Sequence, residues 1–243
     1  MKIGVVMPVY NEGETIRHTI EELQREFLRA MPGSSLFVFE DGSRDSTKQV
    51  LAEIAKESQW CKVQLGDRRL GYPGAAKSAL TSRQLQTFNW VLFMDSDGQY
   101  DPRDFSRLVA EAQSGNFDIV MGRRVRRAEA TYRVVLSIGL RGLEYILFRP
   151  ACRDFTSALR LMKVDKITPI ASSVRYSSYN FWLEFTARVA RAELRVSELP
   201  VSYRARQGAS RVYSTRKMPY VILDELRALL KTWNEREPLS QPG

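Results

Sequence analysis

The apolar residues of this chain fall into short runs, and segments with helical spacing separate them. The apolar runs predict β-strands at 2–8, 35–40, 63–65, 89–94 and 117–122, and the spacing predicts helices at 14–28, 45–56 and 102–112. A Gly-rich stretch, GYPGAAKSAL, is expected as a loop that opens a further helix. Strands that are apolar throughout and alternate with helices are typical of a parallel sheet covered on both faces, so the pattern predicts an α/β fold.

The pattern changes after residue 122. The segments 131–148 and 219–233 are amphipathic and predict two helices, which either pack in the ordinary way or lie on a membrane surface. No window reaches the roughly 20 apolar residues of a membrane-spanning helix. The N-terminal residues lack the pattern of a signal peptide, so a soluble or peripheral protein is expected. The tail 237–243 (EPLSQPG) is expected to be disordered.

Charge and rare residues narrow the chemistry. The net charge of +9 favours a partner that is nucleic acid, anionic lipid or a phosphorylated small molecule. Cys61 and Cys152 have no metal-binding spacing, which argues against a disulfide scaffold and suits a reducing compartment. His18 is the sole histidine, so a His-rich metal site and a Ser-His-Asp triad are both disfavoured. A metal here would need oxygen ligands.

Acidic residues follow three of the predicted strands directly. The strand at 2–8 leads into Glu12, the strand at 35–40 into Asp41, and the strand at 89–94 into Asp95 and Asp97. Ligands of open parallel sheets bind beyond the carboxyl ends of the strands, so these residues predict a binding site. Turn formation is the simpler explanation for each cluster, because Asp, Ser and Gly all favour turns.

The DSDGQ turn suits a divalent cation. Asp95 and Asp97 are separated by one residue, and Gln99 adds a carbonyl oxygen. Such hard oxygen ligands fit Mg²⁺ or Mn²⁺, and the cation would neutralise a diphosphate on a leaving group. At the neighbouring strand end, Asp41 can accept a hydrogen bond from a nucleobase, and Tyr10 can offer the base an aromatic face.

These motifs, in this order, resemble a known family. PVYNE, EDGSRDST, GYPGAAKSAL and MDSDGQYDP resemble the inverting family-2 glycosyltransferases of the GT-A fold, and most of all the dolichol- and polyprenyl-phosphate hexose (mannosyl) synthases. The segments RDFTSALRLMKVD and 179–211 extend the resemblance from Lys2 to about Arg211. It implies a Rossmann-like domain at 1–236 with a mostly parallel sheet. Residues 1–122 would bind the nucleotide sugar, and residues 123–236 would form the acceptor side.

The resemblance also implies roles for individual residues. Those expected around the nucleoside are Pro8, Tyr10, Glu12 and Asp41, and those expected at the metal and diphosphate are Asp95, Asp97 and Gln99. Those expected at the acceptor phosphate are Arg124 and Arg133, and those expected over the donor diphosphate are Arg206 and Arg211. Ser157 would lie near the sugar or acceptor. Glu184 lies where relatives that transfer to hydroxyls carry a catalytic carboxylate.

Four positions depart from the family pattern. Glu40 replaces an Asp, Ala158 a Gly, Arg123 a Ser and Arg211 a Lys. The change at Ala158 adds a methyl group to a tight segment beside the site and leaves the sugar and acceptor open. The change at Arg211 keeps the charge but alters its geometry.

The expected reaction is metal-dependent transfer of a hexose, with inversion, from a nucleoside-diphosphate sugar to a polyprenyl or dolichyl phosphate. A phosphate acceptor is already anionic and needs no strong base. The alternative is transfer to a hydroxyl of a sugar, lipid or natural product, with Glu184 or another carboxylate as base. The expected location is cytoplasmic, with peripheral contact to the inner face of the membrane through 131–148 and the arginines before it.

Two further alternatives are disfavoured. A nucleic-acid partner is not expected, because the sequence contains no RNP, helix-turn-helix or zinc pattern. An inactive partner of another subunit is disfavoured by the intact DSDGQ turn.

Overall fold

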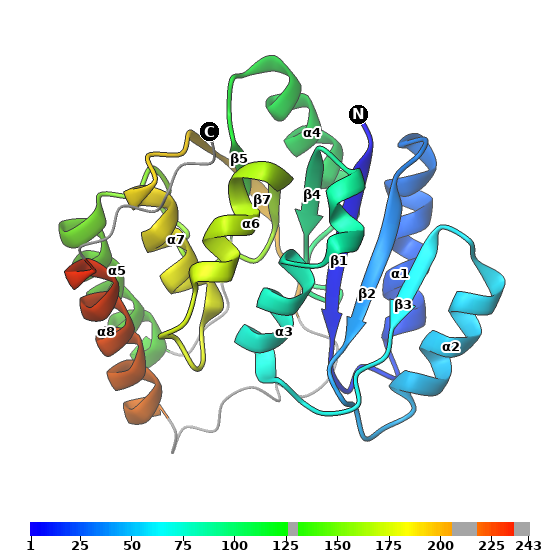
Figure 1. Ribbon diagram of the computed structural model, residues 1–243, viewed down its shortest axis with the longest axis horizontal. Helices are drawn as coiled ribbons and strands as arrows, with labels where there is room; N and C mark the ends of the chain where they lie inside the picture. Colours follow the sequence, from blue (N-terminus) through cyan, green and yellow to red (C-terminus); the bar gives the residue numbers. More distant parts are fainter. Residues whose placement is uncertain (126–130, 206–217, 236–243) are drawn as a thin grey trace.

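One seven-stranded sheet organises the chain in the computed structural model, which describes residues 1–125, 131–205 and 218–235 (Figure 1). For 131–138, Arg141 and Met218 it describes the backbone alone. Across the sheet the strands are β3 (Cys61–Gln64), β2 (Ser35–Glu40), β1 (Ile3–Val9), β4 (Trp90–Phe93), β6 (Arg160–Lys163), β5 (Ile119–Val125) and β7 (Val196–Ser202). Only β6 runs against its neighbours, so the expected mostly parallel sheet is confirmed.

Helices form two groups about this sheet. The α-helices are α1 (Ile16–Glu26), α2 (Thr47–Glu57), α3 (Gly71–Leu80), α4 (Phe105–Ser114), α5 (Thr131–Phe148), α6 (Val164–Ser173), α7 (Phe181–Arg191) and α8 (Met218–Asn234). Short 3-10 helices cover Leu28–Ala30, Arg83–Thr87 and Pro102–Asp104. Helices α3, α6 and α7 contact one another, whereas α1 contacts α2 and the 3-10 turn before α4. Helices α5 and α8 pair beside α7, at the left in Figure 1.

The apolar strands pack as their sequences predict. All of β1 and all of β4 are buried, and Val5 pairs with Leu36 of β2 on one side and Leu92 of β4 on the other. A strand between two neighbours, with helices against it, has no exposed face, which explains the unbroken apolar run.

One expectation needs correction, and one strand was not predicted. The stretch GYPGAAKSAL is not a loop before a helix, because all of it forms α3. Gly71 takes a left-handed φ of 76° at the first position, and Pro73 falls in the first turn, where its missing N–H breaks no helical bond. Strand β6 was not expected from the apolar pattern. It contains Arg160, a charged residue that the surrounding fold buries.

The paired helices α5 and α8 confirm the two predicted amphipathic segments. Within the described residues, no helix is both long and apolar enough to cross a membrane. The predicted tail 237–243 lies outside the described residues.

Helices α5 and α8 also bury two carboxyl groups. Glu144 is fully buried, and its carboxylate oxygens have no hydrogen-bond partner among the described residues. Burial raises its pKa well above the ordinary value. Burial likewise raises the pKa of Glu225 to about 7, although Asn180 lies 3.4 Å from its carboxylate and favours the charged form. Both groups are therefore more stable protonated in the folded chain.

Glu225→Gln should stabilise the protein at alkaline pH. Because its folded pKa lies above the unfolded value of 4.5, the stability that Glu225 contributes is complete below that value and is lost as the pH rises through about 7. Removing the charge should therefore raise the free energy of unfolding by up to about 3 kcal/mol near pH 8 and by much less near pH 5. Thermal melts at the two pH values measure this difference.

Glu235→Gln is the matched control. Burial disfavours the charge of Glu235, but hydrogen bonds from Arg188 and its neighbours outweigh burial and lower its pKa to about 2. This variant should therefore lose stability at alkaline pH. Equal responses of the two variants would show that burial of Glu225 does not control its ionisation.

Candidate active site

The carboxyl ends of β1, β2 and β4 lie side by side. Val9 pairs with Glu40, and Val6 pairs with Phe93, so the turns that leave these three strands meet at one edge of the sheet. The structure therefore brings together the acidic strand ends that the sequence predicted to share a site. We call this region the acidic edge; it comprises residues 10–12, 40–43 and 95–99.

Hydrogen bonds join the first two turns of the acidic edge. Asn11 takes a left-handed φ of 54°, and its backbone N–H donates to the hydroxyl of Ser43 at 2.9 Å. The backbone N–H of Glu12 donates to Thr47 at 2.8 Å, and its carboxylate accepts from Thr15 at 3.0 Å. Glu12 thus lies just before α1, and its carboxylate is hydrogen-bonded to Thr15 at the start of that helix. Pro8 is buried within β1.

Asp41 is held by the start of α3. Its carboxylate oxygens accept from the backbone N–H groups of Leu70 at 2.6 Å and Gly71 at 3.0 Å. Burial raises the pKa of Asp41, and these two bonds oppose that rise. The guanidinium of Arg69 lies 4.0 Å from the centre of the Tyr10 ring. The two groups expected around a nucleobase are therefore in contact with the segment that precedes α3.

Glu40, the departure from the family's Asp, braces the same segment. Its carboxylate accepts from the backbone N–H of Ser43 and, at 3.2 Å, from that of Gly66. Lys48 lies 3.7 Å away and offsets its charge. The longer side chain therefore links β2 to the loop after β3.

The DSDGQ turn follows β4. Asp95 accepts a hydrogen bond from the hydroxyl of Tyr72 at 2.8 Å, and that hydroxyl accepts from the indole N–H of Trp182 at 2.7 Å. Burial and the neighbouring Asp95 raise the pKa of Tyr72 well above its usual value, so the hydroxyl keeps its proton. Asp97 accepts from the backbone N–H of Gln99 at 3.2 Å, across a left-handed Gly98.

The side chain of Gln99 is bound at both ends. Its amide nitrogen donates to the carbonyl of Arg204 at 3.0 Å, and its amide oxygen accepts from the hydroxyl of Tyr203 at 2.9 Å. In the part of the chain that the structure describes, no three acidic, His or Cys side chains gather closely enough to hold a metal ion by themselves. A cation at this turn would therefore need ligands besides these carboxylates.

Arg124, at the end of β5, is paired with Asp154. Its Nε and Nη2 donate to the two carboxylate oxygens at 2.8 and 2.7 Å, and Nη2 also donates to Thr156 at 2.8 Å. Both side chains are nearly buried, with 11% and 9% exposed. Arg206, Arg211 and the side chain of Arg133 lie outside the described residues.

The segment after Asp154 contacts Tyr100, the residue that follows the acidic edge. Ser157 is fully buried, and its hydroxyl donates to the carbonyl of Gly122 and lies 3.2 Å from the hydroxyl of Tyr100. The same tyrosine accepts from the backbone N–H of Ala158 at 3.1 Å. The methyl group of Ala158, which the family's Gly lacks, is buried there, at 2% exposure.

Glu184, on α7, is fully buried among donors. The backbone N–H groups of Arg175, Tyr176 and Ser177 donate to it at 2.8–3.0 Å, and Arg188 donates through Nε at 2.9 Å and Nη2 at 2.7 Å. In the structure this carboxylate fixes the loop between α6 and α7.

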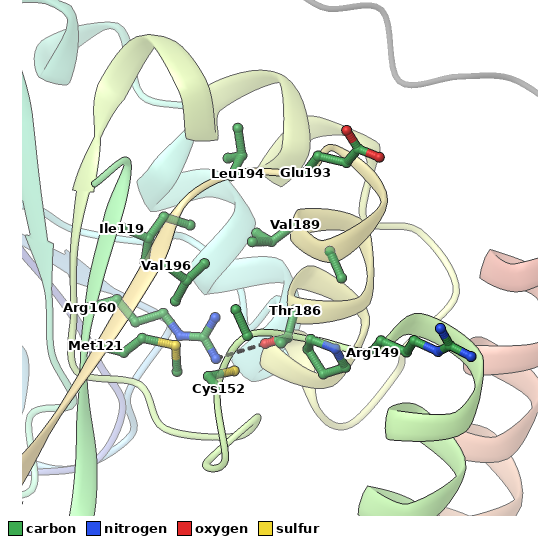
Figure 2. A pocket seen from close by; sticks show the side chains of 13 residues that line it. Ile119, Met121, Arg149, Cys152, Arg160, Thr186, Val189, Glu193, Leu194 and Val196 are labelled. Carbon is green, nitrogen blue, oxygen red and sulfur yellow. Dashed lines mark hydrogen bonds between the residues drawn. The ribbon is translucent and has the colours of Figure 1, made fainter. Parts of the chain in front are cut away.

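A cavity of about 170 Å³ lies between α7 and strands β5–β7, and Arg160 and Thr186 are among the residues that line it (Figure 2). Arg160 donates to the carbonyls of Phe155 and Ser157 at 2.7 and 2.8 Å and to the hydroxyl of Thr186 at 2.9 Å. The lining of the cavity includes no residue of the acidic edge. The cavity is therefore separate from the acidic edge, and residues 149–152, which precede Asp154, line part of it.

The sequence did not reveal Tyr72, Trp182, Asp154 or Arg160 as contacts of the site. Tyr72 and Asp95 are separated by 23 residues, and Tyr72 and Trp182 by 110, so no local spacing could pair them. The nearest signal was that Tyr72 and Asp154 fall within the motifs GYPGAAKSAL and RDFTSALRL.

Comparison with known proteins identifies the class. Residues 4–168 match the family described as glycosyl transferase family 2, and this match covers more than half of the chain. The mixed, mostly parallel sheet also agrees with the solved structures similar to this chain, which have the GT-A fold. The chain therefore belongs to glycosyl transferase family 2, and it is a glycosyltransferase that uses a nucleotide sugar.

Similar proteins come from several organisms. The glycosyltransferase AglD of Haloferax volcanii is 26% identical over 96% of this chain, which spans only 37% of that relative. An undecaprenyl-phosphate mannosyltransferase of Micrococcus luteus is 25% identical over 85% of each protein. Glucosyl-3-phosphoglycerate synthase of Mycobacterium tuberculosis, solved with Mn²⁺, UDP-glucose and phosphoglyceric acid, has a TM-score of 0.68 at 19% identity, covering 97% of this chain and 81% of that one.

Proposed function

We propose that the protein transfers a hexose, with inversion, from a nucleoside-diphosphate sugar to a polyprenyl phosphate. The observation that carries the choice of acceptor is the state of Glu184. This carboxylate is fully buried and bound by backbone N–H groups and by Arg188, which suits a structural brace better than a base that must reach a hydroxyl. A phosphate acceptor needs no such base. The mannosyltransferase of Micrococcus luteus, named for undecaprenyl phosphate, supports the same acceptor class.

The proposed reaction is one displacement. An oxygen of the acceptor phosphate forms a bond to the anomeric carbon as the bond from that carbon to the nucleoside diphosphate breaks on the opposite side. The nucleoside diphosphate leaves with the bonding electron pair. The protein contributes by aligning the two anionic substrates and by compensating the charge on the leaving group.

The acidic edge would hold the donor. Asp95 and Asp97 present the hard oxygen ligands that Mg²⁺ or Mn²⁺ prefers, and magnesium sites commonly use one or two carboxylates together with substrate phosphates and water. The cation would neutralise the diphosphate. Pro8, Tyr10, Glu12 and Asp41 would surround the nucleoside. We propose that Gln99 also lies at the metal and diphosphate, and that Arg206 and Arg211 cover the diphosphate.

The acceptor phosphate would lie on the other side of the sugar. Arg124 emerges from β5, and Asp154 fixes the direction of its guanidinium. We propose that Arg124 and Arg133 together attract this phosphate, because arginine matches phosphate oxygens in geometry and charge. Ser157, in the wall behind Arg124, would support the acceptor side indirectly.

A lipid acceptor calls for a surface that meets the membrane, and helices α5 and α8 offer one. Their exposed large apolar residues are Tyr145, Ile146, Tyr220, Leu223, Leu230 and Trp233. Arg149, Arg227 and Lys231 are exposed on the same helix pair and its end. Apolar and basic side chains together suit the surface of an anionic membrane. We propose that this α5–α8 surface rests on the cytoplasmic face of the membrane.

Asp97→Ala should reduce kcat for transfer by at least about 10²-fold, because the donor diphosphate would lose the charge compensation that it needs as a leaving group. Transfer from nucleotide sugars to a polyprenyl phosphate, measured with Mn²⁺ and with a chelator, tests this. Asp165→Ala, at an exposed position on α6, is the control and should retain activity. Full activity of the Asp97 variant, or of the parent protein in chelator, would falsify the metal role.

Glu184→Gln distinguishes the two acceptor classes. It should lower the melting temperature, because it breaks a buried pair that is worth about 3–5 kcal/mol when one partner is removed. If Glu184 is a base, the substitution should lower kcat roughly 10²–10⁴-fold. If Glu184 only braces the loop, the kcat of the protein that remains folded should fall much less. Arg188→Gln breaks the same pair from the other side and is the matched control.

The reaction product provides a second readout. A glycosyl phosphate is acid-labile, whereas an ordinary glycoside survives mild acid. Comparable activity losses in Glu184→Gln and Arg188→Gln, with a labile product, are expected. An acid-stable product and a far larger kcat loss in Glu184→Gln alone would establish transfer to a hydroxyl instead.

The protein should sediment with anionic phospholipid vesicles at low salt and less so at high salt. Ile146→Glu should weaken this binding on the order of tenfold, because it places a negative charge on the α5–α8 surface. Leu65→Glu, which alters an exposed apolar residue after β3, is the control and should bind as the parent does. Equal losses in both variants would mean that the net charge, rather than this surface, governs the association.

A further inference from the structure

Tyr72 links the DSDGQ turn to helix α7. Its hydroxyl lies 2.8 Å from a carboxylate oxygen of Asp95 and 2.7 Å from the indole nitrogen of Trp182. Trp182 is 1% exposed, and its ring packs edge-on against Phe93, the last residue of β4, at 4.7 Å. The tryptophan is therefore fixed against the strand that leads into the turn.

The direction of these two hydrogen bonds is determined by chemistry. An indole N–H can only donate, so the oxygen of Tyr72 accepts from Trp182. Asp95, as a carboxylate, can only accept, so the hydroxyl hydrogen of Tyr72 points to it. Each bond polarises the next, and a donor to a charged carboxylate makes a short, strong bond. The hydroxyl of Tyr72 is thus committed to Asp95.

The neighbours of Tyr72 hold a second carboxylate of the acidic edge, that of Asp41. The backbone N–H groups of Leu70 and Gly71 donate to Asp41, and Tyr72 follows directly in α3. One short segment at the start of α3 therefore orients both Asp41 and Asp95. Gly71 makes this possible, because its φ of 76° is strained for any residue with a side chain.

We propose that Tyr72 and Trp182 are positioning residues that orient the Asp95 carboxylate for the divalent cation of the donor site. This role rests on the proposed function of the DSDGQ turn. Neither side chain needs to contact the substrate, because the effect is transmitted through Asp95. Loss of the hydroxyl leaves the ring in place but allows the carboxylate to rotate, and removal of such a supporting partner commonly costs 10- to 100-fold in metal affinity.

The test measures the Mn²⁺ dissociation constant of Tyr72→Phe, Trp182→Phe and the parent. The signal of free Mn²⁺ in electron paramagnetic resonance reports it, with GDP or UDP present and no acceptor. The Mn²⁺ dissociation constant should rise by about 10-fold or more in Tyr72→Phe and in the same direction in Trp182→Phe. The kcat at saturating Mn²⁺ should change by less than about threefold, because the cation reaches the same site once bound.

Thr232→Val is the matched control. It removes a fully buried hydroxyl that donates to the carbonyl of Ala228 at 2.8 Å in α8, so it causes a similar structural loss elsewhere. Its melting temperature should fall as that of Tyr72→Phe does, while its Mn²⁺ affinity should match the parent's.

Two outcomes would overturn the inference, and they differ. Unchanged Mn²⁺ affinity in Tyr72→Phe, with a melting temperature lowered as in Thr232→Val, would make Tyr72 a structural residue alone. Failure of the parent itself to bind Mn²⁺ with either nucleotide would instead overturn the proposed metal site, and the role of Tyr72 with it.

Discussion

A carboxylate withdrawn from water must either be matched by hydrogen-bond donors or take up a proton, and the first solution shapes the region around the acidic edge. Asp41 takes backbone N–H groups from the start of α3, and Asp95 takes the hydroxyl of Tyr72. Asp154 takes the guanidinium of Arg124, and Glu184 takes a loop of backbone N–H groups and Arg188. Each pairing ties a different element to the sheet, so satisfying the carboxylates also assembles the site.

Burial separates carboxylates that brace the site from those that can serve substrate. Glu184 and Asp154 are engaged by several donors and are almost inaccessible, so they hold their surroundings in place. Asp95 and Asp97 lie on a turn at the sheet edge and are only partly buried, which suits the donor site that we propose there. The difference follows from where each carboxylate lies in the fold rather than from its residue type.

Strand β6 shapes the region around Arg124 and Asp154. It runs antiparallel between β4 and β5, and the segment that enters it carries Asp154 and Ser157. Arg160, at its first position, holds that segment through the carbonyls of Phe155 and Ser157 and is itself covered by the ring of Trp182 at 4.4 Å. Trp182 therefore contacts both Tyr72, which binds Asp95, and Arg160, which holds the segment after Asp154, so one buried ring joins the two regions.

The sequence by itself determined the alternation of strands and helices, the three acidic strand ends, and the family resemblance. These features are local, because an apolar strand and the turn after it are read from consecutive residues. The roles of Arg206, Arg211 and Arg133 stay predictions from the sequence. The antiparallel β6 and the helical nature of GYPGAAKSAL were decided by the tertiary structure, since packing overrides local propensity. The tertiary structure also decided the contacts of Tyr72, Asp154 and Glu184, because their partners lie far away in sequence or depend on how the backbone turns. Only folding brings hydrogen-bond donors to these carboxylates.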